Sequence, residues 1–340
     1  MNDLLLEVND LVKHFVQREF VLGREKSRVR AVDGVSLHLS AGETLGIVGE
    51  SGCGKSTLAR CILKLLEPTS GRIVFRGVDI TQYSRSQMRP LRREMMMVFQ
   101  DPFGSLNPRK RVGWIVGEPL EVHHWGTKQE IKERVQLLLE RVGLNPEHYN
   151  RLPHEFSGGQ RQRIGIARAL ALEPKLIVCD EPVSALDVSV QAQILNLLAD
   201  LRDEFGLSYI FITHNLDVVR YVANRVVVMY LGKVIEAGPV ESLYRRPRHP
   251  YSASLLSAVP VPSPKLARRR SPIVLEGDIP SPINPPSACR FHPRCPRAQT
   301  ICAQEYPERR IYEGDHFVDC HFPVGRWPLL KPEDIRDPSV

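Results

Sequence analysis

The sequence predicts an α/β fold built around a largely parallel sheet, with a phosphate-binding loop at one edge of that sheet. Over the first 240 residues, short apolar strand-like stretches alternate with helix-like stretches, the pattern of such domains. Residues 49–57 fit the pattern G-x-x-x-x-G-K-[ST] between a strand and a helix. A later apolar strand ends in Asp180 and Glu181. These observations together predict a P-loop, RecA-like nucleoside triphosphatase.

Composition restricts the class of protein. The chain has 340 residues, 42% hydrophobic and 25% charged, which suits one large domain with an appended unit. It has no apolar run long enough to span a membrane and no basic N-terminal signal, so we expect a cytosolic chain whose seven cysteines form no structural disulfides. The net charge is +7, with arginine clusters at 245–248 and 268–270. Such clusters are usually solvated loops, although they could bind nucleic acid or an anionic membrane.

The phosphate loop follows the apolar strand 44–48 and precedes a helical stretch at 57–66. Its glycines allow tight turns that point backbone N–H groups at phosphate oxygens, and the helix adds its positive end. Lys55 is placed to reach the β- and γ-phosphates and Ser56 to ligate Mg²⁺. A merely Gly-rich turn with an exposed lysine is the alternative, which the flanking strand and helix disfavour. The predicted ATP-binding residues here are Gly49, Ser51, Gly52, Cys53, Gly54, Lys55, Ser56 and Thr57.

Cys53 also suggests a chemical probe of the loop. A thiol near a helix N-terminus has a lowered pKa. We therefore expect alkylation of Cys53 to inhibit the ATPase and bound ATP to protect it.

The acidic strand end predicts the hydrolytic centre. Residues 176–179 form a buried strand that delivers Asp180 to hold Mg²⁺ and Glu181 to activate the attacking water. Pro182 follows, so a helix cap is the alternative. Residues 209–213 and 226–230 predict further buried strands.

Residues 101–165 differ from the rest, because they are polar and helical, with the clearest amphipathic helix at 127–142. We interpret this stretch as a helical subdomain inserted in the nucleotide-binding core. At its end lies the rare segment Ser157-Gly158-Gly159-Gln160. A hydroxyl and bare N–H groups at a helix start form a second anion-binding nest, which has no lysine or metal ligand of its own.

With these motifs in this order, the chain resembles the ATP-binding subunits of ABC transporters. The resemblance implies a head-to-tail dimer in which each ATP lies between Lys55 of one chain and the Ser157 region of the other. It also implies that Gln100 senses the γ-phosphate and contacts Mg²⁺, and that His214 acts as a switch histidine. By the same resemblance Asp187 belongs to the interface loop, and Phe15 is the adenine platform, with a core phenylalanine as the alternative.

Residues 98–109, 181–190 and 248–251 resemble one subfamily, the oligopeptide and dipeptide importers. This resemblance implies a peripheral ATPase on the cytoplasmic side of the cytoplasmic (inner) membrane. Its implied partners are two transmembrane permease subunits, a second and different ATPase, and an extracytoplasmic peptide-binding protein. Importers of nickel chelates or glutathione share most of these features. A soluble ABC ATPase that acts on nucleic acid is the rival class, supported only by the basic clusters, and we expect no nucleic-acid partner.

The last hundred residues predict a separate small unit, so we divide the chain at 1–240 and 241–340. Eight prolines lie between 260 and 288, which predicts an extended segment. The cysteines that follow have five, six and seventeen residues between neighbours, without the tight pair of common zinc sites. The resemblance to dipeptide-importer ATPases implies a [4Fe–4S] cluster; zinc, with His292 and His321 as spare ligands, and free thiols or a regulatory disulfide stay open. The predicted ligands are Cys289, Cys295, Cys302 and Cys320.

Overall fold

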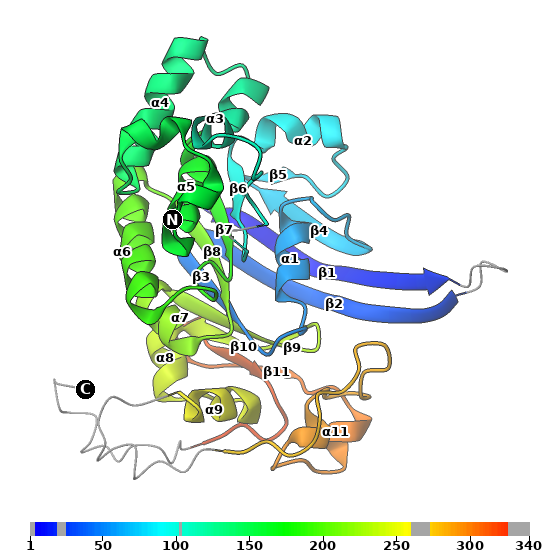
Figure 1. Ribbon diagram of the computed structural model, residues 1–340. Coiled ribbons are helices and arrows are strands. Elements are labelled where there is room, and N and C mark those ends of the chain that lie inside the picture. Colours follow the sequence, from blue (N-terminus) through cyan, green and yellow to red (C-terminus); the bar gives the residue numbers. More distant parts are fainter. Residues whose placement is uncertain (1–3, 19–24, 102–103, 260–272, 326–340) are drawn as a thin grey trace.

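Two β-sheets form the body of the molecule in a computed structural model that describes residues 4–18, 25–101, 104–259 and 273–325 (Figure 1). The larger sheet has the strand order β11-β12-β10-β9-β3-β8-β7-β6 and the smaller one β2-β1-β4-β5. The strands of the larger sheet are β3 (Thr44–Val48), β6 (Met95–Val98), β7 (Leu176–Asp180), β8 (Ser208–Thr213), β9 (Arg225–Tyr230), β10 (Lys233–Pro239), β11 (Arg309–Ile311) and β12 (Phe317–Asp319). Those of the smaller sheet are β1 (Leu4–Arg18), β2 (Glu25–Ser40), β4 (Ser70–Phe75) and β5 (Val78–Asp79).

The centre of the larger sheet is parallel, which confirms the predicted α/β class. Strand β3 lies between β8 and β9, and β7 lies between β8 and β6. Every residue of β3, β7 and β8 is buried, so these strands read as continuous apolar runs. Because carboxyl ends of parallel strands meet at one edge, the phosphate loop after β3, Asp180 at the end of β7 and His214 after β8 come together there.

Helix α1 (Lys55–Ile62) follows the phosphate loop and packs between the two sheets. Leu58, Cys61 and Ile62 are fully buried in the core that both sheets share. The helix ends earlier than the predicted 57–66, because Lys64 adopts a left-handed conformation (φ 52°) that stops it.

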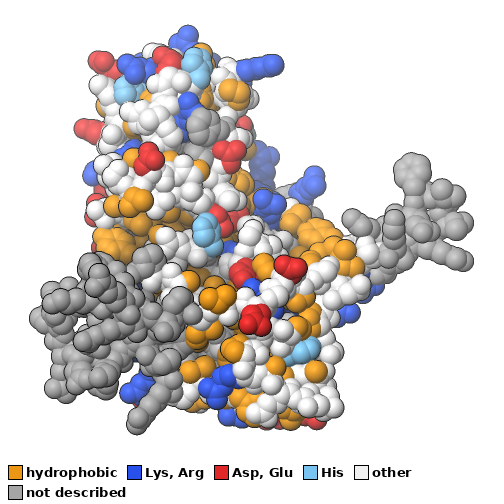
Figure 2. All heavy atoms as spheres, turned by 60° about the horizontal axis from the view of Figure 1, so that its bottom comes forward, with side chains coloured by type: hydrophobic (Ala, Val, Ile, Leu, Met, Phe, Trp, Pro, Cys, Tyr) orange, Lys and Arg blue, Asp and Glu red, His pale blue; other side chains and the backbone are white. Residues whose placement is uncertain are grey.

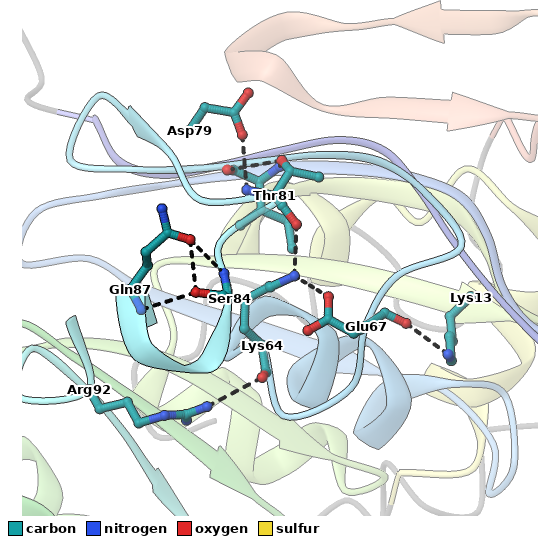
Figure 3. Close-up of polar contacts among 9 residues, drawn as sticks. Lys13, Lys64, Glu67, Asp79, Thr81, Ser84, Gln87 and Arg92 are labelled. Atoms are coloured by element: carbon teal, nitrogen blue, oxygen red, sulfur yellow. Dashed lines mark hydrogen bonds and ion pairs between the residues drawn. The ribbon is translucent and has the colours of Figure 1, made fainter. Parts of the chain in front are cut away.

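A polar network fixes the end of α1 against the smaller sheet (Figure 3). The Lys64 side chain is 1% exposed; its ammonium donates to the Thr81 carbonyl at 2.7 Å and pairs with Glu67. Arg92, which caps α2 (Arg85–Leu91), donates to the Lys64 carbonyl at 3.4 Å. Hydrogen bonds and a counter-charge replace the water lost by the buried ammonium. The network therefore anchors the helix that begins at the phosphate loop.

The predicted helical stretch forms a group of helices at one end of the molecule, opposite the C-terminal segment (Figure 1). Thr127 caps the amphipathic helix through reciprocal hydrogen bonds with Glu130, as the sequence pattern favours. Within the described residues, no helix combines the length and apolar character needed to cross a bilayer. The elements here and after are α3 (Val112–Val122), α4 (Lys128–Arg141), η1 (Pro146–Asn150), η2 (Pro153–Glu155), α5 (Gly158–Leu170), α6 (Val188–Phe205) and α7 (Leu216–Val222).

The C-terminal region joins the larger sheet. Strand β12 pairs antiparallel with β10 through Glu236 and Ala237, and β11 pairs with β12. The remaining elements are α8 (Val240–Arg245), α9 (Pro250–Ser257), η3 (His292–Arg294), α11 (Ile301–Gln304) and η4 (Glu313–Asp315). The last part of the chain is thus an extension of the larger sheet as well as a unit with its own cysteines.

Candidate nucleotide-binding site

A cavity of about 720 Å³ opens at the carboxyl edge of the sheet. This volume suits a nucleotide-sized ligand. Eleven of the residues predicted for ATP binding and hydrolysis line it: Phe15, Gly49, Ser51, Gly52, Gly54, Lys55, Ser56, Thr57, Gln100, Glu181 and His214. The remaining lining residues are Val29, Ala31, Glu50, Leu255 and Pro282.

Two glycines of the phosphate loop leave no space for a side chain. A Cβ atom on Gly49 (φ 152°) would lie 2.2 Å from the Met229 carbonyl oxygen, and one on Gly54 (φ 108°) 2.0 Å from that of Ala31. The Lys55 ammonium donates to the Gly49 and Glu50 carbonyls at 2.7 and 3.0 Å. The lysine thus holds the loop closed and points its charge at the place where phosphates would bind.

Ser56 and Asp180 form the candidate Mg²⁺ pair. The Ser56 hydroxyl donates to Asp180 Oδ1 at 2.8 Å. Burial raises the pKa of the Asp180 carboxyl, and the hydrogen bond from Ser56 opposes this rise. A hydroxyl and a desolvated carboxylate are oxygen donors that suit Mg²⁺, so this pair fits the ion.

The raised pKa of Asp180 predicts how the stability of the folded chain depends on pH. The carboxyl ionises near pH 3.8 when unfolded and higher when folded, so the wild type loses stability as pH rises through that window. We expect Asp180→Asn, which carries no charge to desolvate, to raise the melting temperature at pH 7.5, while hydrolysis is lost. Calorimetry at pH 4 should show a smaller difference, and an equal or larger one would contradict this account.

Glu181 follows β7 and lies between two polar side chains, which follow the neighbouring strands β6 and β8. Gln100 Nε2, after β6, donates to Glu181 Oε2 at 3.1 Å, and His214 Nδ1, after β8, lies 3.3 Å from Oε1. Glu181 itself has a left-handed backbone (φ 46°), a conformation that costs energy and recurs at functional sites. The arrangement points a carboxylate with two polar partners into the cavity.

Phe15 lies on the wall of the cavity, with 39% of its surface exposed, so it is not a core phenylalanine. Leu255 and Pro282 line the same cavity from the C-terminal region. An exposed ring in a mostly apolar wall is suited to stacking on a base.

The burial and the pKa of the Cys53 thiol differ from the expectation. Its side chain is 3% exposed, does not line the cavity, and packs against Gly49. The expected lowered pKa is wrong: burial raises the pKa of this thiol, and this effect outweighs the nearby Lys55. A helix N-terminus lowers a thiol pKa only where the thiolate stays solvated.

We therefore expect Cys53→Ala to leave the ATP dissociation constant within about threefold of wild type, or roughly 0.7 kcal/mol. The reason is that the side chain does not line the cavity. Titration with a fluorescent ATP analogue measures this, and alkylation at pH 7.5 should be slow with or without ATP. A loss of affinity of about tenfold or more would place the thiol in the binding surface.

The segment Ser157–Gln160 does not line this cavity. Ser157 is exposed and caps α5; its hydroxyl accepts from the Gln160 amide at 3.3 Å. A Cβ on Gly159 would lie 2.5 Å from Val190 Cγ1, so α5 packs closely on α6. Asp187, at the start of α6, is exposed beside Val188, which is 82% exposed. Ser157 and Asp187 therefore lie on a second, outward-facing surface, whereas Gly159 is buried beneath it.

The four C-terminal cysteines line one small cavity of their own, together with His292 and His321. All four are free thiols; Cys302 and Cys320 are buried, and burial raises the pKa of Cys320 to about 12 and that of Cys289 to about 11. Among the described residues, no three or more His, Cys, Asp or Glu side chains are arranged to hold one metal ion. The thiols thus share the lining of one cavity.

On the face drawn in Figure 2, the Lys and Arg side chains of the described residues are interspersed with Asp and Glu side chains. Arg245, Arg246 and Arg248 line a hollow with Glu313. The cluster at 268–270 lies outside the described residues.

Sequence reasoning missed the C-terminal contacts of the phosphate loop. The Glu50 amide donates to the Tyr251 hydroxyl at 2.9 Å, and Arg294 binds the Glu50 carboxylate. The available signal was the segment 248–251, which the subfamily resemblance singled out without giving it a role.

Known proteins match most of this chain. Residues 32–184 match the family model described as ABC transporter, and residues 235–302 match that of the oligopeptide/dipeptide transporter C-terminal region. The chain is 53% identical to the oligopeptide transport ATP-binding protein AppF of Bacillus subtilis (94% of this chain, 97% of that protein). It is 51% identical to OppF of Salmonella typhimurium (93% and 96%) and 49% identical to the di/tripeptide transport ATP-binding protein DppF of Pseudomonas aeruginosa (94% and 98%).

Two solved structures share the fold. The ATP-binding cassette MJ0796, in a dimeric post-hydrolysis state bound to ADP and Pi, superposes with a TM-score of 0.62 at 28% identity, over 69% of this chain and 99% of that one. The cbiO1 protein of Clostridium perfringens, part of the cbiONQ transporter complex, gives 0.61 at 33% identity over 71% and 91%.

Proposed function

The chain belongs to the ABC transporter ATPase family, with the C-terminal region of the oligopeptide/dipeptide branch, and from this premise we propose that it powers peptide import. The resemblance stated from the motifs is confirmed. The observation that carries the proposal is the cavity in which Lys55, Ser56, Glu181 and His214 meet, in a chain about half identical to peptide-transport ATPases.

The chain's own residues divide the hydrolysis between them. Lys55 and the loop amides bind the phosphates, and Glu181 takes the proton of the attacking water. Gln100 and His214 hold the Glu181 carboxylate in place, and His214 donates to the γ-phosphate. Ser56, Asp180 and Gln100 would hold Mg²⁺, which when bound neutralises phosphate charge and polarises the transferred group.

The exposed Ser157 surface completes the site on a second ATPase chain. In this arrangement ATP lies between Lys55 of one chain and Ser157–Gln160 of its partner, with Asp187 near the contact. The dimeric form of MJ0796 bound to ADP and Pi supports such an association. ATP adds bridging contacts only in the closed dimer, so it shifts the population toward closure, and loss of the γ-phosphate reverses the shift.

Transmembrane permease subunits are the partners that a peptide-importer ATPase requires. We further propose that the partners are a pair of permeases, a second and different ATPase, and an extracytoplasmic peptide-binding protein. The proposed location is the cytoplasmic face of the membrane. The names of the relatives favour peptides over nickel chelates or glutathione. The segment after Gln100 would carry dimer closure to the permeases.

The cysteine cavity is suited to an iron–sulfur cluster. A single zinc ion needs its thiolates about 2.3 Å from one point, whereas a [4Fe–4S] cluster is larger and takes four thiolates further apart. The four thiols of this chain share the lining of one small cavity, and this proximity supports a site that takes four thiolates. When bound, a cluster would cross-link the loops of this unit.

We expect the chain purified without oxygen to carry about four irons, and Cys302→Ser to reduce iron below about one per chain. Iron and labile sulfide analysis measures this, together with absorbance near roughly 400 nm. Cys53→Ala is the control that should retain iron, since its thiol lies outside the cysteine cavity. Stoichiometric zinc in place of iron would overturn the assignment.

The function is tested by anaerobic pull-down of the tagged chain from solubilised membranes, followed by peptide uptake in proteoliposomes. We expect permease subunits and a second ATPase in the eluate, and uptake of a labelled tripeptide that requires ATP. A Glu181→Gln complex should assemble equally but transport nothing. Recovery with RNA and without membrane proteins would favour the nucleic-acid alternative.

A further inference from the structure

The cysteine-bearing segment at residues 289–295 has a second face, which lies against the phosphate loop. Cys289 and Cys295 line the cysteine cavity. Beside Cys295, Arg294 donates from both terminal nitrogens to the two carboxylate oxygens of Glu50, at 2.9 and 3.1 Å. The Arg294 side chain is 8% exposed and that of Glu50 22%. A two-point pair of this kind fixes orientation as well as charge.

Glu50 is held at three points. Its amide donates to the Tyr251 hydroxyl at 2.9 Å, its carbonyl accepts from the Lys55 ammonium at 3.0 Å, and its carboxylate accepts from Arg294. Two of these three partners come from the C-terminal region. The phosphate loop is therefore shaped in part by residues more than two hundred positions away.

An aromatic cluster makes this connection rigid. The Phe291 ring packs edge-on against Tyr230 and Tyr251, with ring centres 5.3 and 5.4 Å apart, and all three side chains are at most 1% exposed. Arg294 also donates to the Tyr230 hydroxyl at 3.3 Å. Close packing leaves little freedom for the segment to move without the loop.

The ion pair between Arg294 and Glu50 affects the charge that bound phosphates would meet. The Glu50 residue lines the cavity in which the triphosphate would bind. An unpaired carboxylate at this place would repel the phosphates, and in a partly buried site this repulsion is weakly screened. Arg294 removes that charge and holds the loop at the same time.

We propose that Arg294 is a positioning residue for ATP binding, which neutralises Glu50 and ties the phosphate loop to the cysteine-bearing segment. This deepens the proposed function and rests on ATP binding in this cavity. Coupling between two sites is reciprocal, so bound ATP must also stabilise residues 289–295. The placement of residues 289–295 is thereby coupled to ATP affinity.

Arg294→Gln tests the proposal in the purified full-length chain with a fluorescent ATP analogue. We expect affinity to fall about tenfold, which corresponds to 1.4 kcal/mol, while kcat at saturating ATP stays within about twofold. The matched control is Arg309→Gln, because Arg309 makes an equally two-point pair with Asp319 at 2.9 and 3.1 Å in the same region, away from the cavity. Equal affinity losses in both variants, or a loss in neither, would overturn the proposal.

Two further measurements separate positioning from general damage. In a Glu50→Gln background, Arg294→Gln should weaken binding by less than about twofold, since no carboxylate remains to be neutralised. Hydrogen exchange over 289–295 should slow when ATP binds the wild type and not when it binds Arg294→Gln. The proposal is contradicted if Arg294→Gln weakens ATP binding as much in the Glu50→Gln background as in the wild type. It is also contradicted if the exchange rate over 289–295 in the wild type does not change when ATP binds.

If Arg294→Gln does not fold, Tyr251→Phe removes only one hydroxyl and should weaken ATP binding about fivefold, the value of one hydrogen bond. Unchanged affinity there would count against the C-terminal role. A wild-type chain that binds no ATP would end the proposed function itself. Wild-type binding matched by Arg294→Gln would end only the positioning role.

Discussion

Glu181→Gln is expected to reduce kcat for ATP hydrolysis by at least about 10²-fold, the usual contribution of a general base. The amide keeps the shape of the side chain and one acceptor oxygen for Gln100 or His214, but it accepts no proton from water. Since Glu181 is not placed to bind the phosphates, the ATP dissociation constant should stay within about threefold of wild type. Single-turnover hydrolysis and equilibrium binding by the same preparation measure both quantities.

The control for this variant is Glu241→Gln, an exposed carboxylate that pairs with Arg245 on α8. It removes one charge of the same kind far from the cavity and should leave both constants unchanged. A Glu181→Gln chain that hydrolyses ATP at more than about a tenth of the wild-type rate would require another base. His214 is the first candidate, because its imidazole lines the same cavity and its Nδ1 lies 3.3 Å from Glu181 Oε1.

The hydrolytic centre could be predicted from sequence because each of its parts is local. Gly49–Thr57 joins one strand to one helix, and Asp180, Glu181 and His214 each follow an apolar strand. In a parallel sheet the ends of such strands share an edge, so the motifs meet without any knowledge of side-chain packing. In the structure Glu181, His214 and the loop residues other than Cys53 line one cavity, and Asp180 is joined to that lining by its hydrogen bond with Ser56.

What could not be predicted depends on long-range contacts. Arg294 and Glu50 are 244 residues apart, and no periodic pattern connects them. The pairing of β12 with β10 could not be predicted either, because a strand of three residues is too short for its sequence to show an alternating pattern. The prediction of a lowered pKa for Cys53 was wrong for a different reason. Its position near a helix start favours the thiolate, but burial opposes the thiolate more strongly. Burial depends on how the loop folds, which the sequence motif does not reveal.

Ser157→Asp is expected to lower the turnover of the assembled ATPase by about 10²-fold while leaving ATP binding by the isolated chain within about twofold of wild type. An aspartate caps a helix as well as a serine does, so α5 should be preserved. Its negative charge would face the phosphates that the partner chain holds. Because Ser157 lies outside the cavity of its own chain, binding there should not respond.

Ser157→Asn is the matched variant, since it also caps the helix but adds no charge. It should therefore lose much less turnover than the aspartate. Equal losses in the two variants would show that the hydroxyl, and not charge, is what the partner site requires. A fall in ATP affinity of the isolated Ser157→Asp chain would mean that this segment acts on the nucleotide of its own chain. The test thus separates a site made by two chains from one completed within a single chain, through a residue whose side chain is exposed in the structure.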